Sequence, residues 1–156
     1  MNTPLDRTDH EILRELANDA RISNKELAAR VRLAPSTCLE RVRRLKESGV
    51  LSGFHAEIDP AALGIGLQAM IAVRLRQHSR ANFDALRAHF LSLPEVVSLF
   101  HVGGSEDFLV HVAVRDTERL RALAWESFTA RPEVAHIETS LIFEHARSRV
   151  LPRFLP

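Results

Sequence analysis

The sequence lacks several features that would assign it to a specialised class of protein. Its 156 residues include one cysteine and no tyrosine, and no apolar run approaches the length of a membrane span. A lone cysteine, Cys38, forms neither an intramolecular disulfide nor a cysteine-rich zinc site. Because no basic segment followed by an apolar stretch opens the chain, we expect a protein that is neither secreted nor membrane-spanning, in a reducing, cytoplasmic setting.

Charge of either sign is scarcely in excess, with 21 Lys and Arg against 20 Asp and Glu. A net charge of +1 argues against a chain coated with basic residues to grip any polyanion. The composition, 46% apolar and 26% charged, is that of an ordinary globular protein, and the length suits one medium domain or two small ones. Any nucleic-acid site must therefore be local.

Hydrophobic periodicity predicts a helix within residues 5–20, where apolar residues recur at spacings of one and three. Two N-caps compete for its start. Thr8 has capping-box spacing from Glu11, and Asp6 lies two residues earlier.

Two further helices are predicted before residue 50. Ser23 and Glu26 form the capping-box pattern of the second, and after a three-residue turn Pro35 suits the first position of the third. Gly49 is expected to end that helix in a left-handed conformation, and Cys38, Val42 and Leu45 give it an inner face. The arrangement predicts a helix-turn-helix, and residues 50–58 after it predict an extended, wing-like strand.

The second half changes period and predicts four strands and two helices. Their order is strand, helix, strand, strand, helix, strand, which predicts a ferredoxin-like βαββαβ domain and an α+β protein. The strands are apolar on both sides although the helices of this fold cover one face only. We therefore expect dimerisation through the open face. The expected strands are 67–76, 96–102, 108–114 and 134–143, and Asp116 is expected to cap the second helix.

These boundaries predict a helix-turn-helix DNA-binding domain at 1–58, a linker at 59–65 and a ferredoxin-like domain at 66–144. Trp125 is expected in the core of the second domain or at an interface. A basic and apolar C-terminal tail at 145–156 either packs along a neighbouring subunit or stays disordered.

Positive charge is concentrated on the predicted second and third helices. Between residues 21 and 46 there are eight basic and two acidic residues, a local net charge of +6. The recognition helix of a helix-turn-helix reads bases from its N-terminal half, where Arg41 suits guanine and Glu40 suits cytosine. The alternative is a solvated helix face in which the arginines pair with acidic neighbours. The residues expected on the outer, DNA-binding face are Ser36, Thr37, Glu40, Arg41, Arg43 and Arg44.

Four segments carry a family resemblance: Leu-Asp-Arg-Thr-Asp at 5–9, Arg-Ile-Ser-Asn-Lys-Glu-Leu-Ala at 21–28, Cys-Leu-Glu-Arg-Val-Arg-Arg-Leu-Lys at 38–46 and Gly-Ser-Glu-Asp-Phe-Leu at 104–109. In these segments the chain resembles the Lrp/AsnC family of bacterial and archaeal transcription regulators. The resemblance implies sequence-specific binding to double-stranded DNA and a homodimer that assembles to a tetramer or octamer. It also implies a free amino acid or related small molecule bound between dimers. One departure is Ala34, where relatives often have a serine that caps the recognition helix.

The resemblance further implies which residues lie near the effector: Gly103, Gly104, Ser105 and Asp107 in the loop between the second and third strands, and Thr139 on the last strand. Glycines allow close backbone approach, and a carboxylate can receive an ammonium group. The alternatives are a plain hairpin turn, a loop-end cap or surface ion pair for Asp107, and an ordinary strand residue for Thr139. Relatives often have an acidic residue where this loop has Ser105.

No catalytic constellation accompanies these motifs. The sequence has no evident nucleophile and base pair and no phosphate-binding glycine loop, so we expect no enzyme and no cofactor. His101, His111 and His136 are on predicted strands, but no His-x-His or His-x-x-x-His pair supports a metal site. An architectural protein that binds DNA without an effector is the alternative function.

Overall fold

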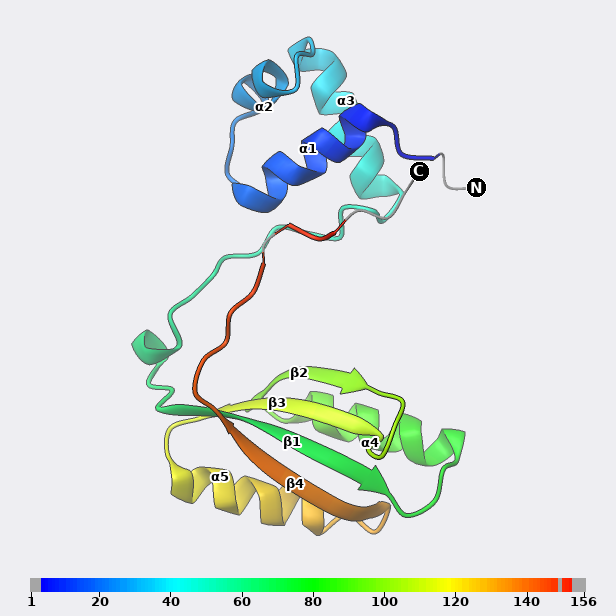
Figure 1. Cartoon of the computed structure of the whole chain (residues 1–156), viewed down its shortest axis with the longest axis vertical. Helices are drawn as coiled ribbons and strands as arrows, with labels where there is room; N and C mark the ends of the chain where they lie inside the picture. Colours follow the sequence, from blue (N-terminus) through cyan, green and yellow to red (C-terminus); the bar gives the residue numbers. More distant parts are fainter. Residues whose placement is uncertain (1–3, 149, 153–156) are drawn as a thin grey trace. The chain divides into compact units, whose positions relative to one another are not determined.

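The computed structural model of the chain describes residues 4–148 and 150–152 (Figure 1). Of the predicted tail 145–156, residues 149 and 153–156 lie outside the described residues. The chain divides into two compact units, one within Met1–Glu57 and Ala146–Pro156, the other Ile58–His145. Among the described residues, no helix is long and apolar enough to cross a membrane.

The first unit contains the three predicted helices, α1 (Arg7–Asn18), α2 (Asn24–Arg30) and α3 (Pro35–Glu47). Their apolar stripes meet in one core, whose fully buried members include Ile12 and Cys38. Burial raises the pKa of the Cys38 thiol, which leaves it protonated and unreactive. The other buried residues of this core are Leu16, Leu27, Ala28, Val31 and Leu45.

The structure decides between the two N-caps of α1. Asp6 is the cap, because its side chain accepts a hydrogen bond from the Asp9 amide and the Asp9 side chain accepts one from the Asp6 amide. At α2 the Ser23 hydroxyl accepts from the Glu26 amide as predicted, but the Glu26 carboxylate pairs with Arg30 at 2.7 Å. The reciprocal half of that capping box was therefore wrong.

Gly49 follows α3 with φ at 75°, the left-handed conformation predicted for it. The wing-like strand was wrong: residues 50–58 contain no strand, because none of the described segments pairs with them as a ladder partner. The turn between α2 and α3 also contains a left-handed residue, Arg32, with φ at 57°.

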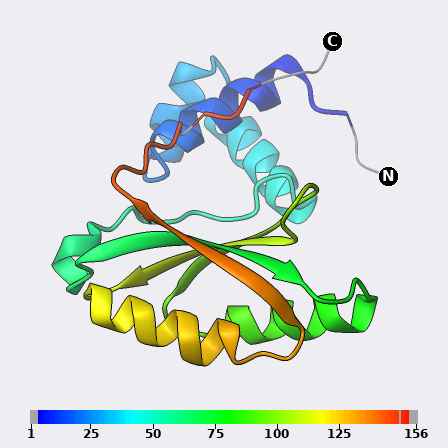
Figure 2. The ribbon, with the colours of Figure 1, turned by 60° about the horizontal axis from the view of Figure 1, so that its bottom comes forward.

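The second unit is an antiparallel sheet with the strand order β2-β3-β1-β4, covered on one face by helices (Figure 2). This is the predicted ferredoxin-like arrangement. Asp116 caps the second helix, as expected. The elements are η1 (Pro60–Leu63), β1 (Leu67–Leu75), α4 (Arg80–Ser92), β2 (Val96–His101), β3 (Phe108–Val114), α5 (Thr117–Leu123), the π-helical turn η2 (Ala124–Thr129) and β4 (Val134–Ile142).

Alternation along the strands separates the two faces of this sheet. On β1, Ile71 and Val73 are fully buried beneath the helices, with Phe90 of α4 and Phe128 of η2 stacked at 4.6 Å between ring centroids. The intervening residues face the open side, where Met70 is only partly buried. Each strand therefore contributes one set of side chains to the core and another to the open face.

Candidate DNA-binding and effector sites

The exposed face of α3 is polar in its N-terminal half. Ser36, Thr37 and Glu40 are exposed, and Arg43 retains 68% exposure beside Glu40, at 3.5 Å, and Glu47, at 3.7 Å. Such surface pairs contribute little to stability and are easily exchanged for phosphate or base contacts. The N-cap of α3 is Ala34, whose side chain cannot accept a hydrogen bond from the first amides of the helix.

Arg41 and Arg44 are directed toward α1. The Arg41 guanidinium lies 2.6 Å from Asp6 and 2.9 Å from Asp9, and Arg44 donates to both carboxylate oxygens of Asp9 at 2.9 and 2.8 Å. Only 23% of the Arg41 side chain is exposed. The prediction that Arg41 lies on the outer face was therefore wrong, because a buried carboxylate on α1 attracts it; Arg44 is half exposed.

Asp6 and Arg41 shift each other's pKa. The Asp9 amide, and after it the Arg41 guanidinium, hold the pKa of the Asp6 carboxyl below its ordinary value. Asp6, and after it Asp9, raise the pKa of Arg41. The Asp6 carboxyl and the Arg41 guanidinium are therefore both charged near neutral pH, and Arg41 reaches DNA only by leaving these partners.

Two further contacts fix the helices of the first unit against one another. The Asn24 side chain at the start of α2 donates to the Pro35 carbonyl at the start of α3, at 2.8 Å. Arg30 of α2 bonds Glu15 of α1 at 3.0 Å, and Arg30, followed by Arg14, lowers the pKa of Glu15. The N-terminal turn of α3 is thus held in a defined orientation.

The loop predicted to lie near an effector, residues 103–107, is exposed at Gly103, Gly104 and Ser105. Gly104 has φ at 138°, a conformation that L side chains rarely adopt, and a Cβ at either glycine would meet open space. Backbone amides of this loop can therefore approach a ligand closely.

Asp107, at the end of the same loop, is buried and already bonded. One carboxylate oxygen accepts from the Leu75 amide at 2.7 Å, and the other lies 2.9 Å from the Nε2 atom of the exposed His78. Its backbone amide donates to the carbonyl of Val73 at 2.9 Å. These bonds match the loop-end alternative for Asp107; its contact with a ligand stays a prediction.

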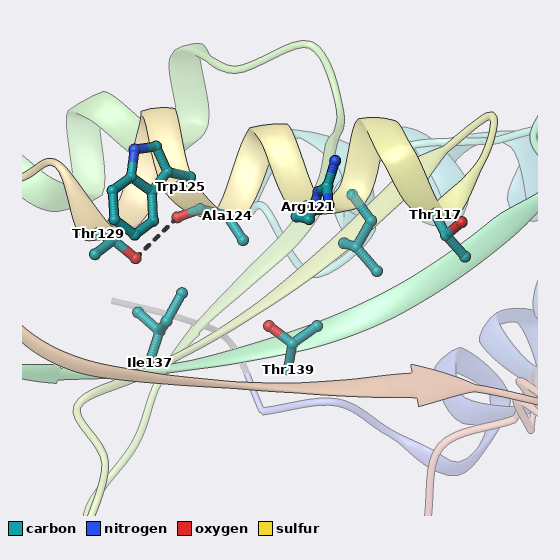
Figure 3. A pocket seen from close by; sticks show the side chains of 8 residues that line it. Thr117, Arg121, Ala124, Trp125, Thr129, Ile137 and Thr139 are labelled. Carbon is teal, nitrogen blue, oxygen red and sulfur yellow. Dashed lines mark hydrogen bonds between the residues drawn. The ribbon is translucent and has the colours of Figure 1, made fainter.

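A hollow of about 390 Å³ lies between β4 and the α5–η2 segment (Figure 3). Ile137 and Thr139 project from β4 toward the α5–η2 segment, Ile137 below Trp125 and Thr139 below Arg121. Trp125 is 70% exposed. The core alternative for Trp125 was therefore wrong. Arg121 lines the hollow and makes no ion pair within the described part of the chain. The remaining lining residues are Thr117, Leu120, Ala124 and Thr129.

Thr139 and the loop 103–107 do not meet within one chain. Thr139 is opposite Ile71 in the sheet, whereas Asp107 precedes the pairing of Phe108 with Val73 on the other side of β1. No residue of the loop lines the hollow. The residues predicted to bind the effector therefore form two separate groups.

The open face of the sheet contains one buried histidine. His111 on β3 is 5% exposed, and its Nε2 atom lies 2.8 Å from the side-chain oxygen of Gln68. The ring of His145 lies 5.7 Å away, centroid to centroid. Burial first, and His145 second, lower the pKa of His111. The partly buried Met70, Ala72 and Leu109 and the exposed Phe100 share this face.

The predicted strand histidines do not converge. His101 packs against Phe83 on the helical face, His111 faces the opposite side, and His136 lies on β4, beyond β1. Within the described ranges, no three His, Cys, Asp or Glu side chains are placed to hold a metal ion.

Sequence reasoning missed Asp9, Arg121 and Trp125 as members of these sites. Asp9 was detectable in principle, since an aspartate three residues after an N-cap aspartate has capping-box spacing. Nothing local indicates that it also attracts two arginines from 32 and 35 residues away. The hollow depends on how η2 packs against β4, for which the sequence has no short-range signal.

A helix-turn-helix with an exposed polar and basic recognition helix, joined to a ferredoxin-like domain with a hollow, defines a DNA-binding transcriptional regulator. The model of the Lrp/AsnC ligand-binding domain matches residues 68–151, and that of a winged helix-turn-helix DNA-binding domain matches residues 5–52. The chain belongs to the Lrp/AsnC family, as its sequence motifs indicated.

Three relatives illustrate the likeness. The HTH-type transcriptional regulator AldR of Mycolicibacterium smegmatis is 50% identical over 92% of this chain and 84% of its own. The leucine-responsive regulatory protein of Rhizobium meliloti is 38% identical over 92% of each chain. The structure of a transcriptional regulator of Neisseria meningitidis in complex with L-Met has a TM-score of 0.86 at 29% identity, over 93% of this chain and 94% of its own. The curated relatives are transcriptional regulators, not enzymes.

Proposed function

We propose that this regulator inserts α3 into the major groove of double-stranded DNA and that a free amino acid bound to the second unit controls it. The observation that supports an amino-acid effector is the likeness, over almost the whole chain, to a regulator solved in complex with L-Met. A name that refers to leucine among the relatives favours an amino acid with an apolar side chain.

On the DNA side, exposed side chains of α3 that can contact DNA include Ser36, Thr37, Glu40 and Arg43. Arg44, half exposed beyond its bonds to Asp9, can add a phosphate contact. In a dimer, two such helices would occupy successive major grooves about 34–36 Å apart. Arg41 then acts by holding α3 on α1 and not as a base reader.

On the effector side, the chemistry of the hollow suits a carboxylate attached to an apolar group. Arg121 supplies a guanidinium that has no ion-pair partner among the described residues, the hydroxyls of Thr117 and Thr139 can donate hydrogen bonds, and Ile137 and Trp125 supply apolar surface. An amino acid has both groups. The exposed amides at Gly103 and Gly104 supply a second group of donors at a separate place.

A ligand that touched both groups would have to lie between protomers. Thr139 and the loop are separated by β1 in one chain, so we infer that the loop of one protomer meets the hollow of another. This agrees with assembly of dimers into a tetramer or octamer. Effector binding shifts such an assembly only if the ligand binds one arrangement more tightly than the other.

The test is a thermal-shift screen of the full chain against the twenty amino acids and common keto acids, with light scattering on each hit. A ligand at 100 times its Kd raises the unfolding free energy by about 2.7 kcal/mol. Trp125 is the single tryptophan, so its fluorescence reports on the hollow directly. We expect a selective hit that changes Trp125 emission and is lost in Arg121→Ala.

Arg115→Ala is the matched control, since Arg115 is exposed on the chain just before α5 and lines no part of the hollow. A hit that leaves Trp125 emission unchanged and survives Arg121→Ala would move the effector to the loop. Absence of any hit would favour the alternative, an architectural protein that binds DNA without an effector, with a steep salt dependence and little sequence preference.

A further inference from the structure

One large apolar side chain of α3 is exposed on the same side of the helix as the residues expected to contact DNA. Leu39 of α3 is 59% exposed, whereas its neighbours Cys38 and Val42 pack into the core. Leu39 lies one turn after Ser36 and one turn before Arg43, which are both exposed. It therefore lies on the same side of the helix as these polar side chains.

Because Arg41 bonds to α1 and its N-cap, Leu39 is one of few side chains that the N-terminal half of α3 exposes. With Arg41 bonded to Asp6 and Asp9, the N-terminal half of α3 presents two hydroxyls, one carboxylate and one apolar side chain to the groove. The bond from Asn24 to the Pro35 carbonyl fixes the first turn of the helix. The position of Leu39 is therefore fixed by the packing of α3.

The largest apolar group that the major groove offers to a leucine is the C5 methyl of thymine. Cytosine has only a C5–H at that position, and the edges of adenine and guanine are mainly hydrogen-bonding groups, so an apolar side chain over them would desolvate donors and acceptors without replacing their hydrogen bonds. We infer that Leu39 reads a thymine methyl group in each half-site and so sets part of the sequence preference. This inference rests on the proposed insertion of α3 into the major groove.

The experiment begins with an operator selected in vitro by the full-length protein. Each thymine is then replaced singly by deoxyuridine, which removes the methyl group and leaves the hydrogen-bonding edge unchanged. Affinities are compared for the unmodified chain, Leu39→Ala and Leu63→Ala. Leu63 is the matched control, a leucine of similar exposure on η1, outside the helix-turn-helix.

The unmodified chain should lose affinity by about fourfold at one thymine of each half-site, the value expected for one methyl group. Leu39→Ala should bind the thymine operator several-fold more weakly and be indifferent to deoxyuridine at that same position. Leu63→Ala should retain the full response. Thermal unfolding and light scattering of Leu39→Ala should match the unmodified chain, because the side chain is on the surface.

Three results would overturn the inference. One is an operator whose thymines are all insensitive to loss of the methyl group, a measurement that requires no variant. Another is a Leu39→Ala variant with unchanged sensitivity at every position, and the third is a changed oligomeric mass, which would assign Leu39 to a subunit contact. A selection that yields no preferred sequence would instead contradict the insertion of α3 itself.

Discussion

Asp9 on α1 and Arg44 on α3 are joined by two hydrogen bonds of 2.9 and 2.8 Å, one to each carboxylate oxygen. Asp9 is 1% exposed and also accepts from Arg41 and from the Asp6 amide. A buried carboxylate therefore accepts hydrogen bonds from two arginines of α3 and from the N-cap residue of its own helix. It fixes the orientation of the recognition helix and removes Arg41 from the DNA-facing surface.

Asp9→Ala should destabilise the helix-turn-helix by about 2–3 kcal/mol. The change leaves two arginines and the Asp6 amide without their acceptor, and partial exposure of the arginines limits the loss. Hydrogen exchange of α1 and α3 amides in the full chain measures this locally. Unchanged protection of both helices would contradict the role of Asp9, and exchange in β1 serves as the internal control.

Arg43→Ala and the double variant Arg41→Ala with Arg44→Ala should both weaken operator binding, but for different reasons. Arg43→Ala should reduce affinity about tenfold with no change in thermal unfolding, because Arg43 contacts only exposed partners.

The double variant Arg41→Ala with Arg44→Ala should abolish binding and also loosen α3, while the oligomer remains intact. Arg7→Ala, an exposed arginine on α1, is the charge-matched control.

Variants of Asp107 and His78 should show whether Asp107 has a structural role or binds a ligand. Asp107→Ala leaves the buried Leu75 amide without an acceptor and should destabilise the second unit by about 1–3 kcal/mol, with or without amino acids. His78→Ala removes only an exposed partner and should change the unfolding free energy by less than about 1 kcal/mol. Urea unfolding measures both. Equal effects would contradict a structural Asp107.

His111 should make the stability of the second unit depend on pH. Its folded-state pKa lies below the ordinary value, so the unfolded chain binds the proton first as the solution is acidified. Stability is therefore fully present above about pH 6.5 and declines as pH falls through the folded pKa. Melting temperatures at about pH 7.5 and pH 5.5 should differ less in His111→Gln than in the unmodified chain.

His136→Gln is the control for this pH dependence, since His136 is exposed on β4 of the same sheet. It should leave the difference between the two melting temperatures unchanged. If His136→Gln and His111→Gln flatten the dependence equally, the burial of His111 is not its cause.

Met70→Lys should dissociate the dimer expected through the open sheet face. Met70 is partly buried on the central strand β1, opposite His111, so a lysine there would place a charge inside the interface. Light scattering should report a monomer that keeps its circular dichroism. Leu91→Lys, at an exposed leucine of α4 on the covered side of the sheet, should leave the mass unchanged.

The sequence by itself determined the element order, the α+β class and the family, because these follow from local signals. Apolar spacing distinguished helices from strands, Pro35 and Gly49 bounded the recognition helix, and the strand order followed from the βαββαβ pattern. The inward face of α3, with Cys38 and Leu45, was likewise readable from a period of 3.6 residues.

Tertiary structure alone decided how the polar side chains are used. Helical periodicity assigns Arg41 to a face, but only the position of a buried Asp9 more than thirty residues away determines that it turns toward α1. Likewise, Asp107 accepts a hydrogen bond from the Leu75 amide, and the strand order places β1 between Thr139 and the loop. A polar side chain with several possible partners bonds to the buried charge or amide, because a buried group left unpaired costs more free energy than an exposed group left in water.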